Sequence, residues 1–332
     1  MRLAVATARS LVEDAMTAVG QDAGSAALIA DHLIDCELRG LHYGGLSRAL
    51  SIVERLKTTN KPAAMVVERD TPVVARIDGG DQIGYVVAHR ATRMAIDKAR
   101  ASGLAAVAAH NTWYTGMLSY YAEMAAAEGL VSMIASNASP WVAPHGATEG
   151  RFGTNPICFG FPSAGEPVIW DIGTSAIIHA EATLHRRLGT PLPEGVAFDA
   201  SGSPTVDPAA ALAGAFAPWG GHKGSGLAIA VHLLGMLAGS PVIPPELARF
   251  GFLILAIDPA SLTAADQWKT DVAAYADAVR GARPVPHGLP VRMPFDRSRE
   301  ERRRRLAEDA IDVADTVYAA LRKVTGVSPQ GS

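Results

Sequence analysis

The sequence is poor in cysteine, in aromatic residues and in charge of one sign, and each shortage excludes a class of protein. Two cysteines among 332 residues cannot build a disulfide framework, so we expect two free core thiols and a reducing, cytoplasmic setting. Aromatic content of 6% and a formal net charge of −3 leave few stacking platforms and no positive field, which argues against a nucleic-acid partner. The N-terminal stretch is an amphipathic helix pattern, not a signal peptide, and no apolar run reaches the ~18 residues of a membrane span.

Several nucleotide and metal motifs are also missing. No G-x-G-x-x-G follows a strand and opens a helix, and there is no Walker A string, H-E-x-x-H or G-x-S-x-G. No cysteine or histidine cluster has zinc spacing, so we expect no metal site. A bound nucleotide would therefore need a less common mode of binding than the Rossmann fingerprint.

Hydrophobic periodicity predicts helices first and then an alternation of helices and strands. We expect helices at 10–19, 25–38 and 46–56, with a glycine-rich loop at 39–48. From residue 72 the predicted elements alternate: strands at 72–78, 104–109 and 130–136, and helices at 83–101 and 115–128. Gly103 and Gly129 stand where helix C-caps are expected. This alternation is typical of an α/β fold.

The second half of the chain adds an antiparallel element. Strands at 156–161 and 167–171 flank a short turn and predict a hairpin, so the sheet should be mixed. The further expectations are a loop at 183–208, a helix at 223–238, a strand at 251–257, a helix at 263–280, a crossover at 281–296 and a final helix at 298–322. We divide the chain into an N-terminal helical segment, 1–70, a cofactor-binding domain, 71–250, and a C-terminal segment, 251–332, that packs with the first.

The densest polar and glycine-rich region is 110–175, which begins at a strand-to-helix junction. Backbone N–H groups at the helix start near Thr115 and Gly116 could hold a pyrophosphate. The loop at 136–156 leaves a strand end, where α/β folds place their ligands. We therefore expect the binding site in this region.

Six motifs along nearly the whole chain carry a family resemblance. They are R-G-x-x-x-x-G-x-x-R (39–48), GTNP (153–156), D-x-x-T-S (171–175), P-x-G-G-x-K-G (218–224), FLILAIDP (252–259) and M-P-F-D-R-S-R (293–299). Each motif is weak alone, but together and in this order they are specific. With them the chain resembles the malate/L-lactate dehydrogenase family of the second type, which includes cyclic imino acid reductases and 2-hydroxy acid dehydrogenases.

The resemblance implies a fold and an activity. The implied fold is α/β and non-Rossmann, with a mixed, largely antiparallel cofactor-binding sheet, flanking helices and a second region built from both chain ends. The implied protein is a homodimer that uses NADPH or NADH. It would transfer hydride to the C=N or C=O carbon next to the carboxylate of a small substrate.

The resemblance also assigns roles to residues. Arg48 matches a carboxylate-binding arginine, whose planar fork suits a carboxylate, and Thr154 matches a substrate contact. Glu181 matches an acidic residue that orients the proton donor. His145 either faces the nicotinamide or caps a loop. The positions matching cofactor contacts are Thr115, Gly116, Met117, Leu118, His145, Asp171, Ile172, Gly173, His179, Lys223 and Gly224.

Two departures from the family pattern put the proton donor in question. The usual donor histidine is Gly44 here, and a second family histidine is Tyr114. Tyr43 or Tyr114 could donate instead, His42 could swing in from the flexible loop, or the substrate could be a cyclic iminium that carries its own proton. The alternative is a cofactor-binding member of the family with lost or repurposed catalysis.

Overall fold

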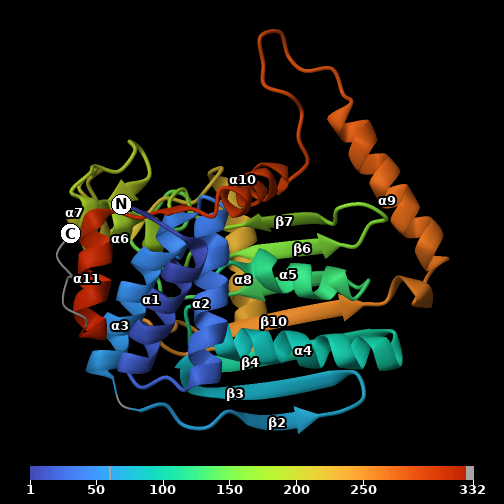
Figure 1. Ribbon diagram of the computed structural model, residues 1–332, viewed down its shortest axis with the longest axis horizontal. Coiled ribbons are helices and arrows are strands. Elements are labelled where there is room, and N and C mark those ends of the chain that lie inside the picture. Colours follow the sequence, from blue (N-terminus) through green and yellow to red (C-terminus); the bar gives the residue numbers. More distant parts are fainter. Residues whose placement is uncertain (60, 327–332) are drawn as a thin grey trace.

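The computed structural model describes residues 1–59 and 61–326 and is built around one seven-stranded sheet (Figure 1). The strand order is β2-β3-β4-β10-β5-β6-β7. β3 and β4 pair in parallel, and every other neighbouring pair is antiparallel. The strands are β2 (Val66–Asp70), β3 (Val74–Ile83), β4 (Leu104–Trp113), β5 (Val131–Ser136), β6 (Ile157–Phe161), β7 (Val168–Ile172) and β10 (Phe250–Ile257). The predicted α/β class, the hairpin and the mixed sheet are confirmed.

Helices cover the two faces of this sheet unequally. On one face α4 (Gly84–Ser102) and α5 (Leu118–Ala127) pack through small residues such as Ala91 and Ala122 against Ile134 and Cys158. Their alanines have no bulk to hold the helices away, so backbone and sheet approach closely. The other face carries α8 (His222–Ala238), which contacts β4, β5 and β10. In the described part of the chain, no helix has the length and apolar character needed to cross a bilayer.

The two ends of the chain meet in a second core. The helices α1 (Val5–Ala18), α2 (Ala23–Leu38), α3 (Leu46–Thr58) and α11 (Asp315–Thr325) share buried residues that include Leu33, Ile52 and Leu321. The short strands β1 (Arg2–Leu3) and β11 (Ile311–Asp312) pair beside them. The predicted segment 251–332 is thus split in space, because β10 lies inside the sheet whereas α11 packs with the N-terminal helices.

Some element boundaries differ from the sequence expectations. The predicted helix at 298–322 is two helices, α10 (Asp296–Ala307) and α11, because β11 interrupts them to pair with β1. Asp309 has φ 44°, which the turn between them requires. The start of the predicted loop at 183–208 belongs to a helix, α6 (His179–Leu188). The remaining elements are η1 (His42–Gly44), β8 (Ala197–Phe198), α7 (Pro208–Ala213), β9 (Ala215–Phe216), η2 (Pro259–Ser261) and α9 (Ala265–Arg280).

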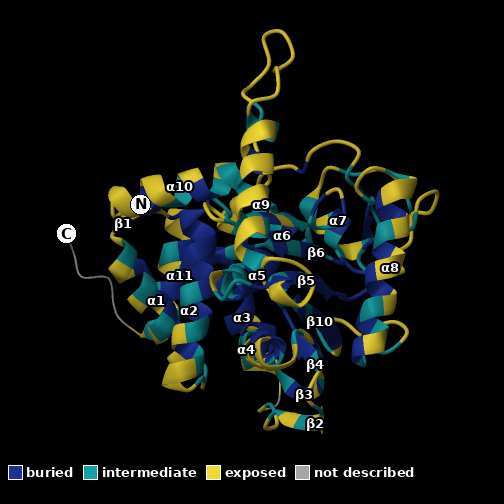
Figure 2. Ribbon diagram, turned by 90° about the vertical axis from the view of Figure 1, so that its right-hand side faces the viewer, coloured by how far each residue is buried: buried dark blue, intermediate teal, exposed yellow. Residues whose placement is uncertain are grey.

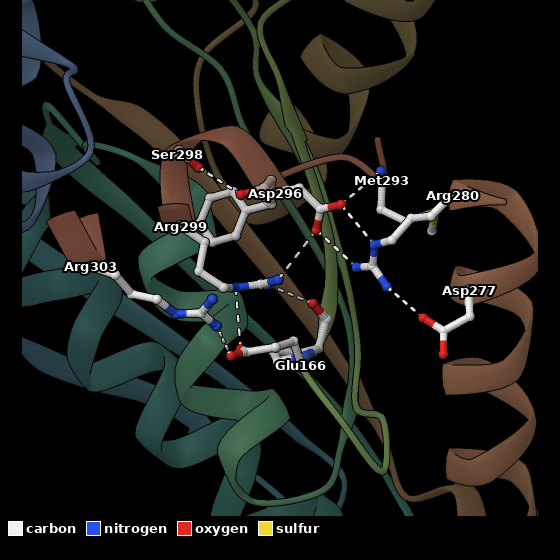
Figure 3. Close-up of polar contacts among 10 residues, drawn as sticks. Glu166, Asp277, Arg280, Met293, Asp296, Ser298, Arg299 and Arg303 are labelled. Carbon is white, nitrogen blue, oxygen red and sulfur yellow. Dashed lines mark hydrogen bonds and ion pairs between the residues drawn. The ribbon is translucent and has the colours of Figure 1, made fainter. Parts of the chain in front are cut away.

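An arm formed by α9 and the following loop stands away from the body of the molecule (Figures 1 and 2). Residues 281–290 are exposed throughout. The arm is tied at its base, where the guanidinium of Arg280 binds both carboxylate oxygens of Asp296 at 2.9 Å (Figure 3). This ion pair fixes the point at which the chain returns from the arm to the body.

Candidate active site

A cavity of about 460 Å³ lies between the helical core of the chain ends and the sheet. Its wall brings together segments that are far apart in sequence: the glycine-rich loop, the junction between β4 and α5, the end of β7 and the start of α6. The predicted site residues on this wall are Tyr43, Arg48, Tyr114, Thr115, Gly116, Met117, Thr154, Asp171, Gly173 and His179. Most of the polar region singled out in the sequence therefore converges on one space.

Arg48 has the features expected of an anion-binding residue. Its side chain is buried, and its guanidinium carbon lies 4.0 Å from the centroid of the Tyr114 ring, a cation–π contact. The Nη1 atom is buried without a hydrogen-bond partner. A buried donor left unpaired is costly, so a carboxylate entering the cavity would find a donor ready to bind it.

A buried carboxylate holds the loop that carries Tyr43. Glu37 Oε1 accepts a hydrogen bond of 2.7 Å from the backbone N–H of Leu46, and Glu37 Oε2 lies 2.7 Å from His42 Nδ1. A Cβ atom at Gly45 would come within 2.2 Å of Glu37 Oε1, so only glycine permits this approach. The contact turns His42 away, and His42 is absent from the cavity wall, against the expectation that it could swing in as a donor.

Tyr43 reaches the cavity but holds its proton tightly. Burial raises the pKa of its hydroxyl well above the usual range, and the nearby Cys36 and Glu181 act in the same direction. Cys36 also lies where a side chain at position 44 would emerge, because a Cβ on Gly44 would be 3.2 Å from Cys36 Sγ. Tyr43 is therefore placed to donate a hydrogen bond, while full proton transfer from it is costly.

Backbone N–H groups at the start of α5 already donate hydrogen bonds to other parts of the chain. The N–H of Met117 donates to His32 Nε2 at 2.9 Å, and the N–H of Ser119 donates to Asp171 Oδ2 at 2.7 Å. The carboxylate takes the position at the helix N-terminus that an anion would otherwise occupy. The N–H groups of Met117 and Ser119 are therefore not free for a pyrophosphate, which leaves the predicted role to those of Thr115 and Gly116.

The two groups that hold α5 are themselves buried. Burial raises the pKa of Asp171, and its hydrogen bonds with Ser119 oppose that change. Burial also lowers the pKa of His32 to about 3, so its imidazole is neutral and Nε2 is free to accept. Gly116, with φ 75°, leaves room for this ring, since a Cβ there would lie 2.6 Å from Nε2.

His179 and Trp141 form a flat aromatic section of the wall. Their rings stack with centroids 4.1 Å apart, and His179 Nδ1 is buried without a partner. Burial lowers the pKa of His179 to about 3, with a smaller effect from Arg48, so the ring is neutral. These atoms fit a polar, flat cofactor such as a nicotinamide nucleotide.

The remaining predicted residues lie off this wall. Lys223 and Gly224 are in the first turn of α8, and the backbone N–H of His145 donates to Ser225 Oγ of that turn at 3.1 Å. Glu181 is in the first turn of α6. Leu118 is buried at the start of α5 and Ile172 is half-buried at the end of β7.

Sequence reasoning missed the contribution of the C-terminal region to the wall. Arg292, Met293, Phe295, Arg297 and Ser298 all line the cavity. Asp296 holds this stretch by accepting from the N–H of Met293 at 3.0 Å as well as from Arg280 (Figure 3). The signal was available, because four of these five residues, all but Arg292, belong to the M-P-F-D-R-S-R motif. Asn137 and Trp141 also line the cavity and belong to the loop at 136–156 where a ligand was expected, whereas Tyr85 had no distinguishing motif.

Comparison with known proteins places the chain in a family. A family model described as malate/L-lactate dehydrogenase matches residues 3–322. L-sulfolactate dehydrogenase of Methanothermobacter thermautotrophicus is 33% identical, over 85% of this chain and 86% of its own. Δ1-Pyrroline-2-carboxylate reductase of Ancylobacter novellus is 33% identical, over 100% of this chain and 99% of its own. The structure of a dehydrogenase from Sinorhizobium meliloti superimposes with a TM-score of 0.90 at 34% identity, covering 98% of both chains.

Proposed function

Because the chain belongs to the malate/L-lactate dehydrogenase family, whose members are NAD(P)-dependent dehydrogenases and reductases, we propose that it reduces a small 2-imino or 2-oxo carboxylate. Hydride would pass from NADPH or NADH to the C=N or C=O carbon next to the carboxylate. The observation that carries this proposal is the unpaired, buried guanidinium nitrogen of Arg48 in the wall of the cavity.

Arg48 would anchor the substrate through its carboxylate. A guanidinium fork binds a planar carboxylate with two hydrogen bonds, which fixes both position and orientation. The Tyr114 ring beneath Arg48 limits the movement of the fork. Thr154, which lies on the same wall, would also contact the bound substrate. Such positioning would hold the reacting carbon in one orientation before hydride arrives.

The pKa values of the ionisable groups in the cavity favour an imine over a ketone as the substrate. Burial raises the pKa values of Tyr43 and Cys36, and His179 is already deprotonated at neutral pH. A ketone needs a proton on its oxygen as hydride adds, and these three groups are poor sources of one. A cyclic iminium brings its own N–H, so hydride adds to carbon, the C=N electron pair moves to nitrogen, and a neutral amine results without a proton from the enzyme.

The cofactor, when bound here, would supply the hydride. Trp141 and His179 would flank the nicotinamide, and residues 115–117 with Gly173 would close the wall around it. We infer a binding mode without Rossmann topology, which is supported by the antiparallel pairing of β4, β10, β5, β6 and β7. From the family resemblance we also propose a homodimer.

A spectrophotometric assay tests the function. The purified protein is expected to oxidise NADPH or NADH with Δ1-pyrroline-2-carboxylate or Δ1-piperideine-2-carboxylate faster than with pyruvate or oxaloacetate. Arg48→Ala should lower kcat/KM ~10²-fold or more, as expected for a lost charge-assisted fork. The exposed Arg90→Ala is the matched control and should retain full activity.

The results of this assay distinguish the proposed function from its alternative. Unchanged kcat/KM in Arg48→Ala would refute the carboxylate role. Dinucleotide binding without turnover of any of the four substrates would instead favour the alternative in which replacement of the usual donor histidine by Gly44 accompanies lost or repurposed catalysis.

A further inference from the structure

A short turn behind the cavity makes contact with two separate parts of its wall. It consists of Pro245, Glu246 and Leu247, between α8 and β10, and we call it the 245–247 turn. Leu247 has φ 47°, a left-handed conformation that a bulky side chain rarely adopts. Backbone strain of this kind persists only where the surrounding contacts hold it, and it is concentrated at sites that position functional groups. The contacts of this turn therefore need a reason.

A buried serine joins the turn to the loop that carries Trp141. The hydroxyl of Ser139, which is fully buried, accepts a hydrogen bond of 2.9 Å from the N–H of Leu247. The same hydroxyl donates one of 2.9 Å to the carbonyl of Pro245. The carbonyl of Ser139 in turn accepts from the N–H of Trp141 at 2.8 Å. The backbone of the turn and the backbone of Trp141 are thus fixed to one residue.

Glu246 holds the other end of the same tryptophan. The indole Nε1 of Trp141 donates to Glu246 Oε2 at 2.9 Å. An indole has one N–H, so this bond sets how the ring is rotated within its own plane. The stack on His179 and an edge-to-face contact with Phe250, at 6.1 Å between centroids, set its tilt. The flat section of the cavity wall is therefore oriented by an exposed carboxylate that lies outside the cavity.

The opposite side of the turn holds α3 through Arg55. The Nε of this buried arginine donates to the carbonyl of Leu247 at 2.9 Å, and its Nη2 donates to Asp81 Oδ1 at 2.9 Å. The guanidinium carbon also lies 4.2 Å from the centroid of the Trp113 ring, a cation–π contact. Three contacts in different directions leave the Arg55 side chain a single position.

Arg55 lies on the face of α3 that also carries Arg48. The two arginines are two helical turns apart, so they point in the same direction. They cover consecutive aromatic residues, because Arg48 lies over Tyr114 as Arg55 lies over Trp113, and those two rings are 5.3 Å apart. A restraint on Arg55 therefore restrains the rotation and the translation of the helix that presents Arg48.

We propose that the 245–247 turn sets the separation between Arg48 and the aromatic wall at Trp141. Arg55 and Glu246 are its positioning residues, because each connects the turn to one side of the site. This inference rests on the proposed function, in which the substrate carboxylate is held on one side and the nicotinamide on the other. A displacement of ~1 Å between the reacting groups can lower the rate ~10²-fold, so a rigid link between the two sides has a direct use.

A titration of the purified protein with reduced dinucleotide tests the Glu246 side. With whichever of NADPH and NADH binds the wild type more tightly, Glu246→Ala should raise Kd about tenfold, as one lost hydrogen bond predicts. Glu246→Gln keeps an acceptor oxygen and should bind like the wild type. Glu194→Ala removes an exposed carboxylate elsewhere and is the matched control, with Kd unchanged.

A double-mutant cycle shows whether Glu246 acts through the indole. Trp141→Phe keeps an aromatic face but removes the N–H donor. In that background Glu246→Ala should raise Kd by less than about twofold, because the hydrogen bond is already absent. A role of Glu246 in general stability of the loop would instead give the same loss in both backgrounds.

The two sides of the turn should differ in kinetics. Arg55→Lys keeps the charge but loses the planar fork that spans Leu247 and Asp81. With saturating dinucleotide, it should raise KM for Δ1-pyrroline-2-carboxylate about tenfold and change the dinucleotide Kd by less than twofold. Glu246→Ala should do the reverse. A loosened fold would move both constants together, and thermal melting identifies any variant that has unfolded.

The outcomes that overturn this inference differ from those that overturn the function. An unchanged Kd in Glu246→Ala, or an equal loss with and without Trp141→Phe, would remove the role of Glu246. Parallel changes of KM and Kd in Arg55→Lys would remove the role of Arg55. A wild type that binds the dinucleotide but turns over no substrate would contradict the proposed function alone, because the Kd values still decide whether Glu246 positions Trp141.

Discussion

The substitution Glu37→Gln would test how the glycine-rich loop is positioned. Glu37 receives hydrogen bonds from the N–H of Leu46 and from His42, and its side chain is 4% exposed. Glutamine keeps the shape of the side chain, but its amide offers one acceptor oxygen and turns a donor toward the other partner. We expect a loss of ~2 kcal/mol in the free energy of unfolding, the usual contribution of a charge-assisted hydrogen bond.

The same substitution should reduce activity only because it displaces Tyr43 and Arg48. Tyr43 lies within the loop, and Arg48 lies in the first turn of α3, which starts at Leu46. A displacement of ~1 Å at the reacting centre can lower the rate ~10²-fold. We therefore expect kcat/KM to fall by one to two orders of magnitude while the cavity residues themselves are unchanged.

The pH dependence makes this prediction specific. The hydrogen bond to Glu37 raises the pKa of His42 above its usual 6.5. A pKa raised in the folded state adds stability that is fully present below pH 6.5 and is lost as pH rises through the folded value. The difference in unfolding free energy between wild type and Glu37→Gln should therefore be larger at pH 6 than at pH 9.

Urea denaturation at both pH values and steady-state kinetics measure these effects. Glu54→Gln is the control, because Glu54 is an exposed partner of Arg187 on the adjacent helix. If Glu37→Gln lowered the free energy of unfolding equally at pH 6 and pH 9, the contribution of the His42–Glu37 hydrogen bond to stability would be refuted. Unchanged kcat/KM in a folded Glu37→Gln variant would refute the positioning of the loop by this carboxylate.

Three further predictions address the cavity and the residues around it. Tyr43→Phe should change kcat with a cyclic imine by less than about threefold, since Tyr43 keeps its proton; a loss of about a hundredfold in stopped-flow turnover would identify it as the acid instead. His32→Ala removes the acceptor of the Met117 N–H and should weaken dinucleotide binding about tenfold, as one lost hydrogen bond predicts; nucleotide fluorescence titration with an unaltered dissociation constant would contradict this. Gly44→His alone should lower the melting temperature because Cys36 crowds position 44. Adding Cys36→Ala should restore the melting temperature and raise the turnover of 2-oxo acids. If the double variant melted no higher than Gly44→His, the crowding would lie elsewhere.

Local patterns were sufficient for much of the fold. The spacing of apolar residues predicted the helices, and Gly103 and Gly129 marked their ends because a left-handed residue is needed there. The hairpin of β6 and β7 also followed from local sequence. The single helix expected at 298–322 failed for a nonlocal reason, since β11 pairs with β1 at the opposite end of the chain.

The sequence by itself determined the family, the class of fold and the identity of Arg48 as the anion-binding candidate, because ordered motifs survive without knowledge of contacts. Only the tertiary structure decided which groups share the cavity. It turned His42 toward Glu37, gave the start of α5 to His32 and Asp171, and added Arg297 from the far end of the chain. The outcomes at α5 and Arg297 depend on packing between segments separated by tens to hundreds of residues, and no local pattern carries that information.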